Sequence, residues 1–170
     1  MTAGGVLGRC LLELHATWRS AAARQVRDPG HHHVGGVVHP AWERAECGPD
    51  SEGRLIADAL TLAVASRRGL LDIDAAPLLA SAGAAATCLI RSMRPGHRID
   101  LLKRHPDDAT ANAFAMQLVG PALLLARAHA DAPGWTAALA PVEEFTRLAT
   151  IGMLDGGFCT PNHRWLLAGG

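Results

Sequence analysis

Apolar side chains recur along this chain at helical spacing, and this spacing restricts the possible fold more than any other feature. The repeats follow i, i+4, i+7 and i+11 or a close variant, which places the side chains on one face of a helix. They are Leu7, Leu11, Leu14 and Trp18; Leu55, Ala59, Leu62 and Ser66; Leu78, Ala82, Ala85 and Leu89; Val142, Phe145, Ala149 and Met153; and, more loosely, Phe114, Leu118, Pro121 and Leu125. Runs of alternating apolar and polar residues are absent, and glycine weakens the one extended piece, residues 34–38. The pattern predicts an all-α fold.

Proline, glycine and aspartate separate these segments and set the expected helix ends. The breaks are Asp28-Pro29-Gly30, Gly48-Pro49-Asp50-Ser51, Arg94-Pro95-Gly96 and Ala132-Pro133-Gly134, and further helix starts fall at Asp72 or Asp74 and at Pro106-Asp107-Asp108. Pro121 is expected to kink or split its helix, because its ring opposes the carbonyl four residues back. We therefore expect five helices plus the start of a sixth at Thr160-Pro161, where threonine suits the N-cap and proline the first turn.

The length of the chain indicates one domain. Its 170 residues fit a single helical domain over residues 1–170. Ala-rich faces allow close helix packing, so we expect antiparallel helical hairpins stacked side by side, joined by longer loops at residues 28–51 and 94–107 that collect polar and aromatic side chains. The sixth helix would have only about ten residues before the sequence ends, which is marginal for a helix. We therefore expect the domain to be an incomplete portion of a larger helical protein.

Charge and cysteine content exclude several classes of protein. Sixteen basic residues balance sixteen acidic ones, which gives no general attraction to nucleic acid or to an anionic membrane. The apolar start of the chain is interrupted by charged residues, so no signal peptide or membrane span is visible, and a cytoplasmic location is the default expectation. Four scattered cysteines without a CxxC pair predict buried free thiols. No cofactor is expected, because the P-loop, GxGxxG, GxSxG and HExxH motifs are absent.

Three adjacent polar residues near the end of the sequence, Asn162, His163 and Arg164, are the first candidate site. At a helix N-terminus, free N–H groups and the helix dipole favour an anion. Asn162 and Arg164 would hold a carboxylate there, while His163 titrates near neutrality. The simpler interpretation is an ordinary capped helix start with Arg164 on the surface.

The segment from Ile99 to Asp108 contains the second candidate site. His105 and Asp108 would act at a cleft as an acid/base pair or as hydroxyl-binding groups. Trp42 would add a flat apolar surface for a sugar ring, whereas Trp18 is expected in the core. The simpler interpretation of Asp108 is a helix N-cap.

A histidine run, His31-His32-His33 followed by His39, suggests a zinc site at first sight. Zinc needs ligands that converge tetrahedrally, usually with a second pair at defined spacing, and adjacent histidines rarely reach one ion. We therefore expect a surface loop beside a cleft, with no metal site.

The motif Gly156-Gly157-Phe158-Cys159-Thr160-Pro161-Asn162-His163-Arg164-Trp165 resembles a signature of bacterial proteins related to heparinase II/III-like enzymes. Residues 24–29 with Gly35-Gly36, and residues 99–101 with 105–108 and 113–114, are similar to the early and middle parts of that family. The resemblance implies a partial α/α toroid that binds a polysaccharide or oligosaccharide and cleaves uronate chains by β-elimination. It implies that Asn162 or Arg164 neutralises the uronate carboxylate, that His163 is the base, and that His105 assists.

Two departures from the family pattern leave other functions open. Cys159 replaces an expected histidine, and the chain has no tyrosine, the usual acid/base of toroid lyases. The first alternative is a toroid glycoside hydrolase that uses an aspartate such as Asp108 or Asp155 with water. The second is a non-catalytic helical scaffold or interaction domain. The sequence gives no indication of the oligomeric state.

Overall fold

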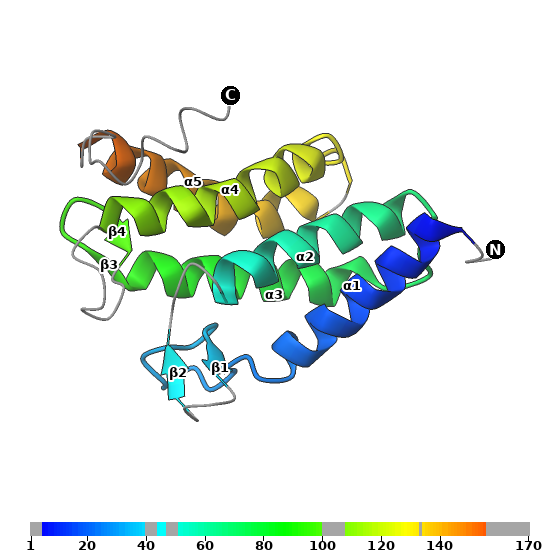
Figure 1. Ribbon diagram of the computed structural model, residues 1–170, viewed down its shortest axis with the longest axis horizontal. Helices are drawn as coiled ribbons and strands as arrows, with labels where there is room; N and C mark the ends of the chain where they lie inside the picture. The colour runs from blue at the N-terminus through cyan, green and yellow to red at the C-terminus, as the bar shows by residue number, and fades with distance from the viewer. Residues whose placement is uncertain (1–4, 40–43, 47–50, 100–107, 133, 156–170) are drawn as a thin grey trace.

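The computed structural model describes residues 5–39, 44–46, 51–99, 108–132 and 134–155, and five helices dominate them (Figure 1). The helices are α1 (Val6–Ala22), α2 (Ser51–Arg67), α3 (Ala75–Arg91), α4 (Asp108–Arg127) and α5 (Trp135–Asp155). Two short antiparallel hairpins join them: β1 (Val37–His39) pairs with β2 (Arg44–Glu46), and β3 (Met93–Arg94) with β4 (Arg98–Ile99). The predicted all-α class and the order of the first five helices are confirmed.

Two helical hairpins, α2/α3 and α4/α5, lie side by side. α2 packs against both α3 and α4, and α5 packs against the other sides of the same two helices. The helices alternate in direction, so α2 and α4 begin at the same end of the bundle at which α3 and α5 finish (Figure 1). α1 contacts chiefly α2 and runs obliquely to it. This stacking of antiparallel hairpins agrees with the sequence prediction.

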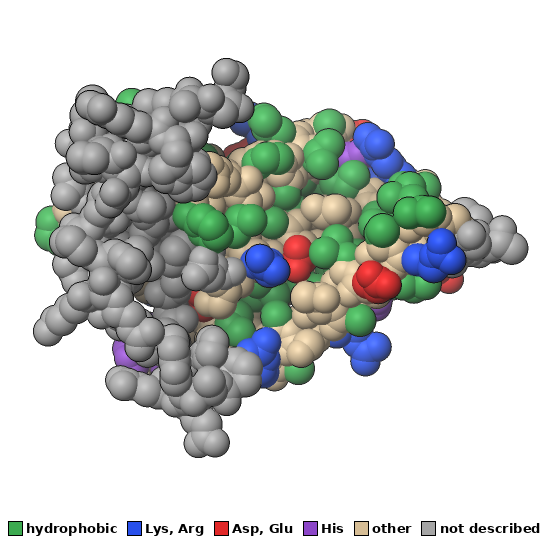
Figure 2. Space-filling view, in the orientation of Figure 1, with side chains coloured by type: hydrophobic (Ala, Val, Ile, Leu, Met, Phe, Trp, Pro, Cys, Tyr) green, Lys and Arg blue, Asp and Glu red, His purple; other side chains and the backbone are tan. Residues whose placement is uncertain are grey.

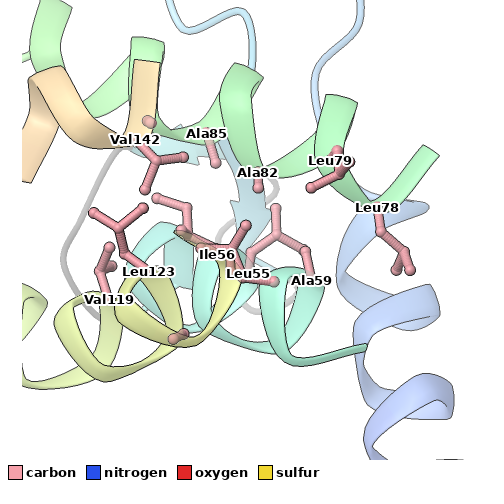
Figure 3. Close-up of a cluster of buried hydrophobic side chains, with 14 of the residues drawn as sticks. Leu55, Ile56, Ala59, Leu78, Leu79, Ala82, Ala85, Val119, Leu123 and Val142 are labelled. Carbon is pink, nitrogen blue, oxygen red and sulfur yellow. The ribbon is translucent and has the colours of Figure 1, made fainter. Parts of the chain in front are cut away.

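The core forms where the predicted apolar faces of α2 and α3 meet those of α4 and α5. Figure 3 shows Leu55 and Ile56 of α2 close to Ala82 and Ala85 of α3, with Val142 of α5 alongside. The predicted faces of α2 and α3 are at most 1% exposed at Leu55, Ala59, Leu62, Leu78, Ala82, Ala85 and Leu89. Each fully buried leucine contributes about 1.5–3 kcal/mol of transfer free energy. The predicted core positions Trp18 and Phe145 are also buried.

Helix α4 differs from its prediction in two respects. The expected apolar face is turned outward: Phe114 is 40% exposed and Leu125 is 49% exposed. The buried face is instead formed by small and branched residues, Ala115, Val119, Ala122, Leu123 and Ala126. This face fits because Gly53 of α2 leaves room for α4, with Ala115 and Leu118 within 4 Å of the place a Cβ would occupy. The helix also continues through Pro121 without being split.

Two local predictions have definite outcomes. Asp74 caps α3, since its side chain accepts a hydrogen bond from the Ala76 N–H at 2.9 Å. The prediction of free thiols is wrong for Cys88, which is disulfide-bonded, while Cys10 is free and exposed. Sequence spacing missed the disulfide because the sulfurs that pair are far apart along the chain.

No helix within the described ranges has the length and apolar content that spanning a membrane requires.

Candidate functional site

Most of the predicted site residues lie outside the described residues. Trp42, His105, Asn162, His163 and Arg164 belong to segments that the structure does not describe. Asp108 begins α4, but its side chain also lies outside the described part. The roles given to these residues therefore stay predictions, and the site is built here from described residues alone.

The described residues that border these segments lie at one end of the bundle. The described residues that border those segments are His39 at the end of β1, Asp108 at the start of α4 and Asp155 at the end of α5. All three are at the end where α2 and α4 begin and α3 and α5 finish, which we call the hairpin end (Figure 1). The described parts of the loops expected to carry the chemistry, including both β-hairpins, are at this end.

The loop from Gln25 to Val37 is anchored on α3. The Gln25 side chain donates to the Gly35 carbonyl at 2.8 Å and to the Ser81 carbonyl at 3.0 Å, and it accepts from the Ser81 hydroxyl at 2.9 Å. Gly35 has a φ of 91° and lies so close to α3 that a Cβ would be 2.1 Å from the Ala84 carbonyl oxygen. Only glycine fits this approach, so the loop has one position against the helix.

The three histidines of this loop lie against one another: His31 and His32 are stacked, and the His33 ring is tilted by 45° to His32. The ring centroids of His31 and His32 are 4.9 Å apart, and those of His32 and His33 are 4.0 Å apart. His31 Nδ1 accepts a hydrogen bond from the His33 N–H at 3.1 Å, which uses one imidazole nitrogen to hold the turn. Across the described residues, no three His, Cys, Asp or Glu side chains are arranged to hold a metal ion.

Glu52 is a buried carboxylate at the hairpin end that the sequence prediction missed. It lies in the first turn of α2 and is fully buried. Its Oε1 accepts from the Val37 N–H at 2.7 Å, and its Oε2 accepts from the Ser51 hydroxyl at 2.5 Å. The favourable helix dipole and these donors offset part of the cost of burying the charge. Glu52 therefore ties β1 to the start of α2, and the Asp50-Ser51-Glu52 run before an apolar segment was its only signal in the sequence.

An open groove between α1 and α2 begins beside this carboxylate. It has a volume of about 640 Å³, and Val37 of β1 and Ser51 of α2 lie at the hairpin end of it. Its polar side chains include Thr17, Ser20, Arg24, Arg54 and Asp58. A second hollow of about 380 Å³ shares Thr17, Arg54 and Asp58 with the first and extends to Leu118 of α4. Acidic and basic side chains lie among hydrophobic ones near the middle of the face that α1, α2 and α4 form (Figure 2).

The charges of the groove differ in how firmly they are held. Arg24 is fixed, because its Nε donates to the Ser20 carbonyl at 3.1 Å and its Nη1 to the Val38 carbonyl at 3.0 Å. Arg54 makes no ion pair or side-chain hydrogen bond with any described residue. Burial raises the pKa of Asp58, and the positive charge of Arg54 opposes that rise. The groove thus contains the fixed guanidinium of Arg24, the exposed guanidinium of Arg54 and the carboxyl group of Asp58, whose pKa is raised.

No protein-family model, curated protein or solved structure matches this chain. The described residues define an all-α bundle of antiparallel hairpins with a charged groove and a cluster of loops at one end. Any functional assignment therefore depends on the chemistry of the groove and of the hairpin end.

Proposed function

We propose that this protein binds a uronate-containing polysaccharide in the groove between α1 and α2 and cleaves it by β-elimination at the adjoining hairpin end. The observation that carries the proposal is the combination of Arg24, Arg54 and Asp58 in one open groove. A guanidinium group recognises a carboxylate through two parallel hydrogen bonds, and a carboxyl group accepts hydrogen bonds from sugar hydroxyls. An acidic sugar chain offers both kinds of partner along its length.

The groove reaches the hairpin end, where the proposal places the cleavage step. Under the proposal, Asn162 or Arg164 neutralises a uronate carboxylate, which acidifies the adjacent C–H bond. His163 removes that proton, the C–O bond to the leaving sugar breaks, a C=C bond forms in the uronate ring, and the proton passes to the leaving oxygen. His105 and Asp108 assist or bind hydroxyls, and Trp42 stacks on a sugar ring. The two stacked hairpins would be part of an α/α toroid.

Binding in the groove is tested by isothermal titration of the whole chain with an oligogalacturonate. Replacing Arg54 by glutamine should weaken binding about tenfold, because one charge-assisted contact to a carboxylate is lost. Arg67→Gln is the matched control, since Arg67 lies at the far end of α2 and faces Asp131 at 3.9 Å. A carboxyl-reduced oligosaccharide of the same linkage should bind more weakly than the acidic one. Equal binding of the two ligands, or an unchanged affinity in Arg54→Gln, would contradict the proposed groove.

The reaction itself is tested separately by the products. β-Elimination leaves an unsaturated uronate that absorbs ultraviolet light, and both His163→Ala and Asn162→Ala should abolish its formation. New reducing ends without this absorbance would indicate the hydrolase alternative. Groove binding without any turnover would support a non-catalytic binding domain and remove the lyase assignment.

A further inference from the structure

Helix α4 presents an apolar surface that nothing in the described structure covers. Leu124 is 70% exposed, Leu125 49% and Phe114 40%, and Pro121 is also exposed between them. No charged residue occurs between Asp108 and Arg127, so this surface lacks the ring of charges that usually keeps an exposed helix in solvent. Figure 2 shows hydrophobic side chains gathered over α4.

Gly120 provides a second observation on the same helix. Three other helical glycines have a neighbour that explains them: Gly53 faces α4, Gly83 faces α5, and Gly152 faces the β3–β4 hairpin. A Cβ on Gly120 would meet no atom of the described residues within 4 Å. Glycine in a helix interior is unfavourable, and no contact inside the described structure requires it here. A glycine on an open helix face allows a backbone from outside to approach closely.

We propose that the α4 surface formed by Phe114, Gly120, Pro121, Leu124 and Leu125 is the contact face between two copies of this chain, paired antiparallel along α4. A second copy fits because an uncharged surface meets its own copy without like-charge repulsion. The helix begins with Asp108 and ends with Arg127, so an antiparallel pair brings the acidic start of each helix to the basic end of the other. The opposed helix dipoles favour the same arrangement.

The geometry of the helix suits a two-fold contact. α4 has 20 residues and is about 30 Å long, which gives a seam of five to six turns. Gly120 lies near its middle, where two antiparallel helices cross and need the closest approach. Arg127 pairs with Glu143 of α5 at 3.3 Å but stays 62% exposed, so its charge remains accessible to the partner. A two-fold axis through this seam makes both copies use the same residues.

The test measures molar mass by light scattering during size-exclusion chromatography, over about a hundredfold range of concentration. The wild type should approach twice the chain mass of 17.8 kDa as concentration rises. Leu124→Glu should remain monomeric over the same range, because it places a charge in the seam. Gly120→Leu should weaken the dimer by separating the helices, with an unchanged helical circular dichroism spectrum in both variants.

Leu154→Glu is the matched control, because Leu154 is 67% exposed at the end of α5 and lies outside the proposed face. It should dimerise like the wild type. A wild type that stays monomeric at every concentration would overturn the proposal. Dimers that persist in Leu124→Glu, or that are lost in Leu154→Glu, would equally overturn it. The result is independent of the carbohydrate proposal, since no groove residue is changed.

Discussion

Asp58 shows how one residue links the packing of α1 and α2 to the chemistry of the groove. It is half-buried in the wall of the groove, and Arg54 lies one helical turn before it. Desolvation disfavours the charged carboxylate more than the neighbouring guanidinium favours it, so the pKa of Asp58 is raised. In its protonated form such a carboxyl group can donate as well as accept a hydrogen bond.

The raised pKa of Asp58 predicts a pH dependence of stability. A folded-state pKa above the ordinary value of 3.8 means that the folded protein binds the proton more tightly. The resulting stabilisation is complete below that ordinary value and is lost as pH rises through the folded pKa. Asp58→Asn should therefore gain thermal stability relative to wild type between about pH 3.8 and neutrality, and this gain should vanish at pH 3.

Thermal unfolding followed by circular dichroism measures this difference. Asp72→Asn, a change in an exposed loop, is the control, and its midpoint should follow that of the wild type across the range. A difference between Asp58→Asn and wild type that does not change with pH would contradict the assigned environment of Asp58.

Single residues were predictable where their role is local. Asp74 could be assigned as a cap because capping involves the next two or three residues of the same segment. Trp18 could be assigned to the core because its position follows the helical repeat. Glu52 and Cys88 could not be assigned, since their contacts join segments that are distant in sequence: Glu52 accepts from Val37, and Cys88 is disulfide-bonded.

At the scale of the helix, glycine positions distinguish internal packing from an open surface. Gly152 of α5 touches the β3–β4 hairpin, whose tip contains Gly96 and His97 with positive φ values of 84° and 57°. Asn112 of α4 donates to the His97 carbonyl at 2.8 Å and to the Ala149 carbonyl at 3.1 Å, so the hairpin is fixed between α4 and α5. Gly120 has no such contact with any residue that the structure describes.

Alanine at these two glycines should change stability in opposite directions. A Cβ at Gly152 would lie 2.3 Å from the His97 carbonyl oxygen and 2.6 Å from Asn112 Nδ2, so Gly152→Ala should destabilise the fold by about 1–3 kcal/mol. Gly120→Ala should stabilise it by roughly 0.5–1 kcal/mol through helix propensity. Urea unfolding at low protein concentration measures both values. A destabilised Gly120→Ala variant would show that α4 is packed on this side.

The helices were predictable in order but not in every orientation. Apolar repeats determine which face of α2 and α3 is buried, because those helices carry one apolar face each. α4 carries apolar residues on most sides, so its sequence permits more than one buried face. The small residues Gly53 and Ala115 select the face that packs against α2, and that selection depends on the neighbouring helix. Propensity and periodicity contain no information about such a pairing.

At the scale of the molecule, alternation of helix direction determines where the loops meet. In two antiparallel helical hairpins stacked side by side, the starts of α2 and α4 lie at the same end as the finishes of α3 and α5. The long connections at residues 28–51 and 94–107 lead into those two starts. Their presence at one end of the bundle was therefore predictable from the sequence. The toroid and the roles of Asn162, His163 and Arg164 stay predictions, because these three residues lie outside the described ranges and five helices do not close a ring.

The disulfide leads to a prediction about the whole chain. Four cysteines are present, and one disulfide removes two of them from the reactive pool. Denatured, unreduced protein should therefore react with a thiol reagent at no more than two cysteines, and reduction should restore four. Disulfides persist chiefly in oxidising compartments, so this result would also argue against the default cytoplasmic expectation. Four reactive thiols before reduction would contradict the bond.

The alternation of α2 to α5 also has a practical consequence for anyone who handles this protein. The link between α2 and α3, residues 68–74, is at the end of the bundle opposite to the two β-hairpins. A fluorophore or an affinity tag inserted there would project away from the hairpin end. Molecules immobilised through this link would all present the end that carries the β-hairpins.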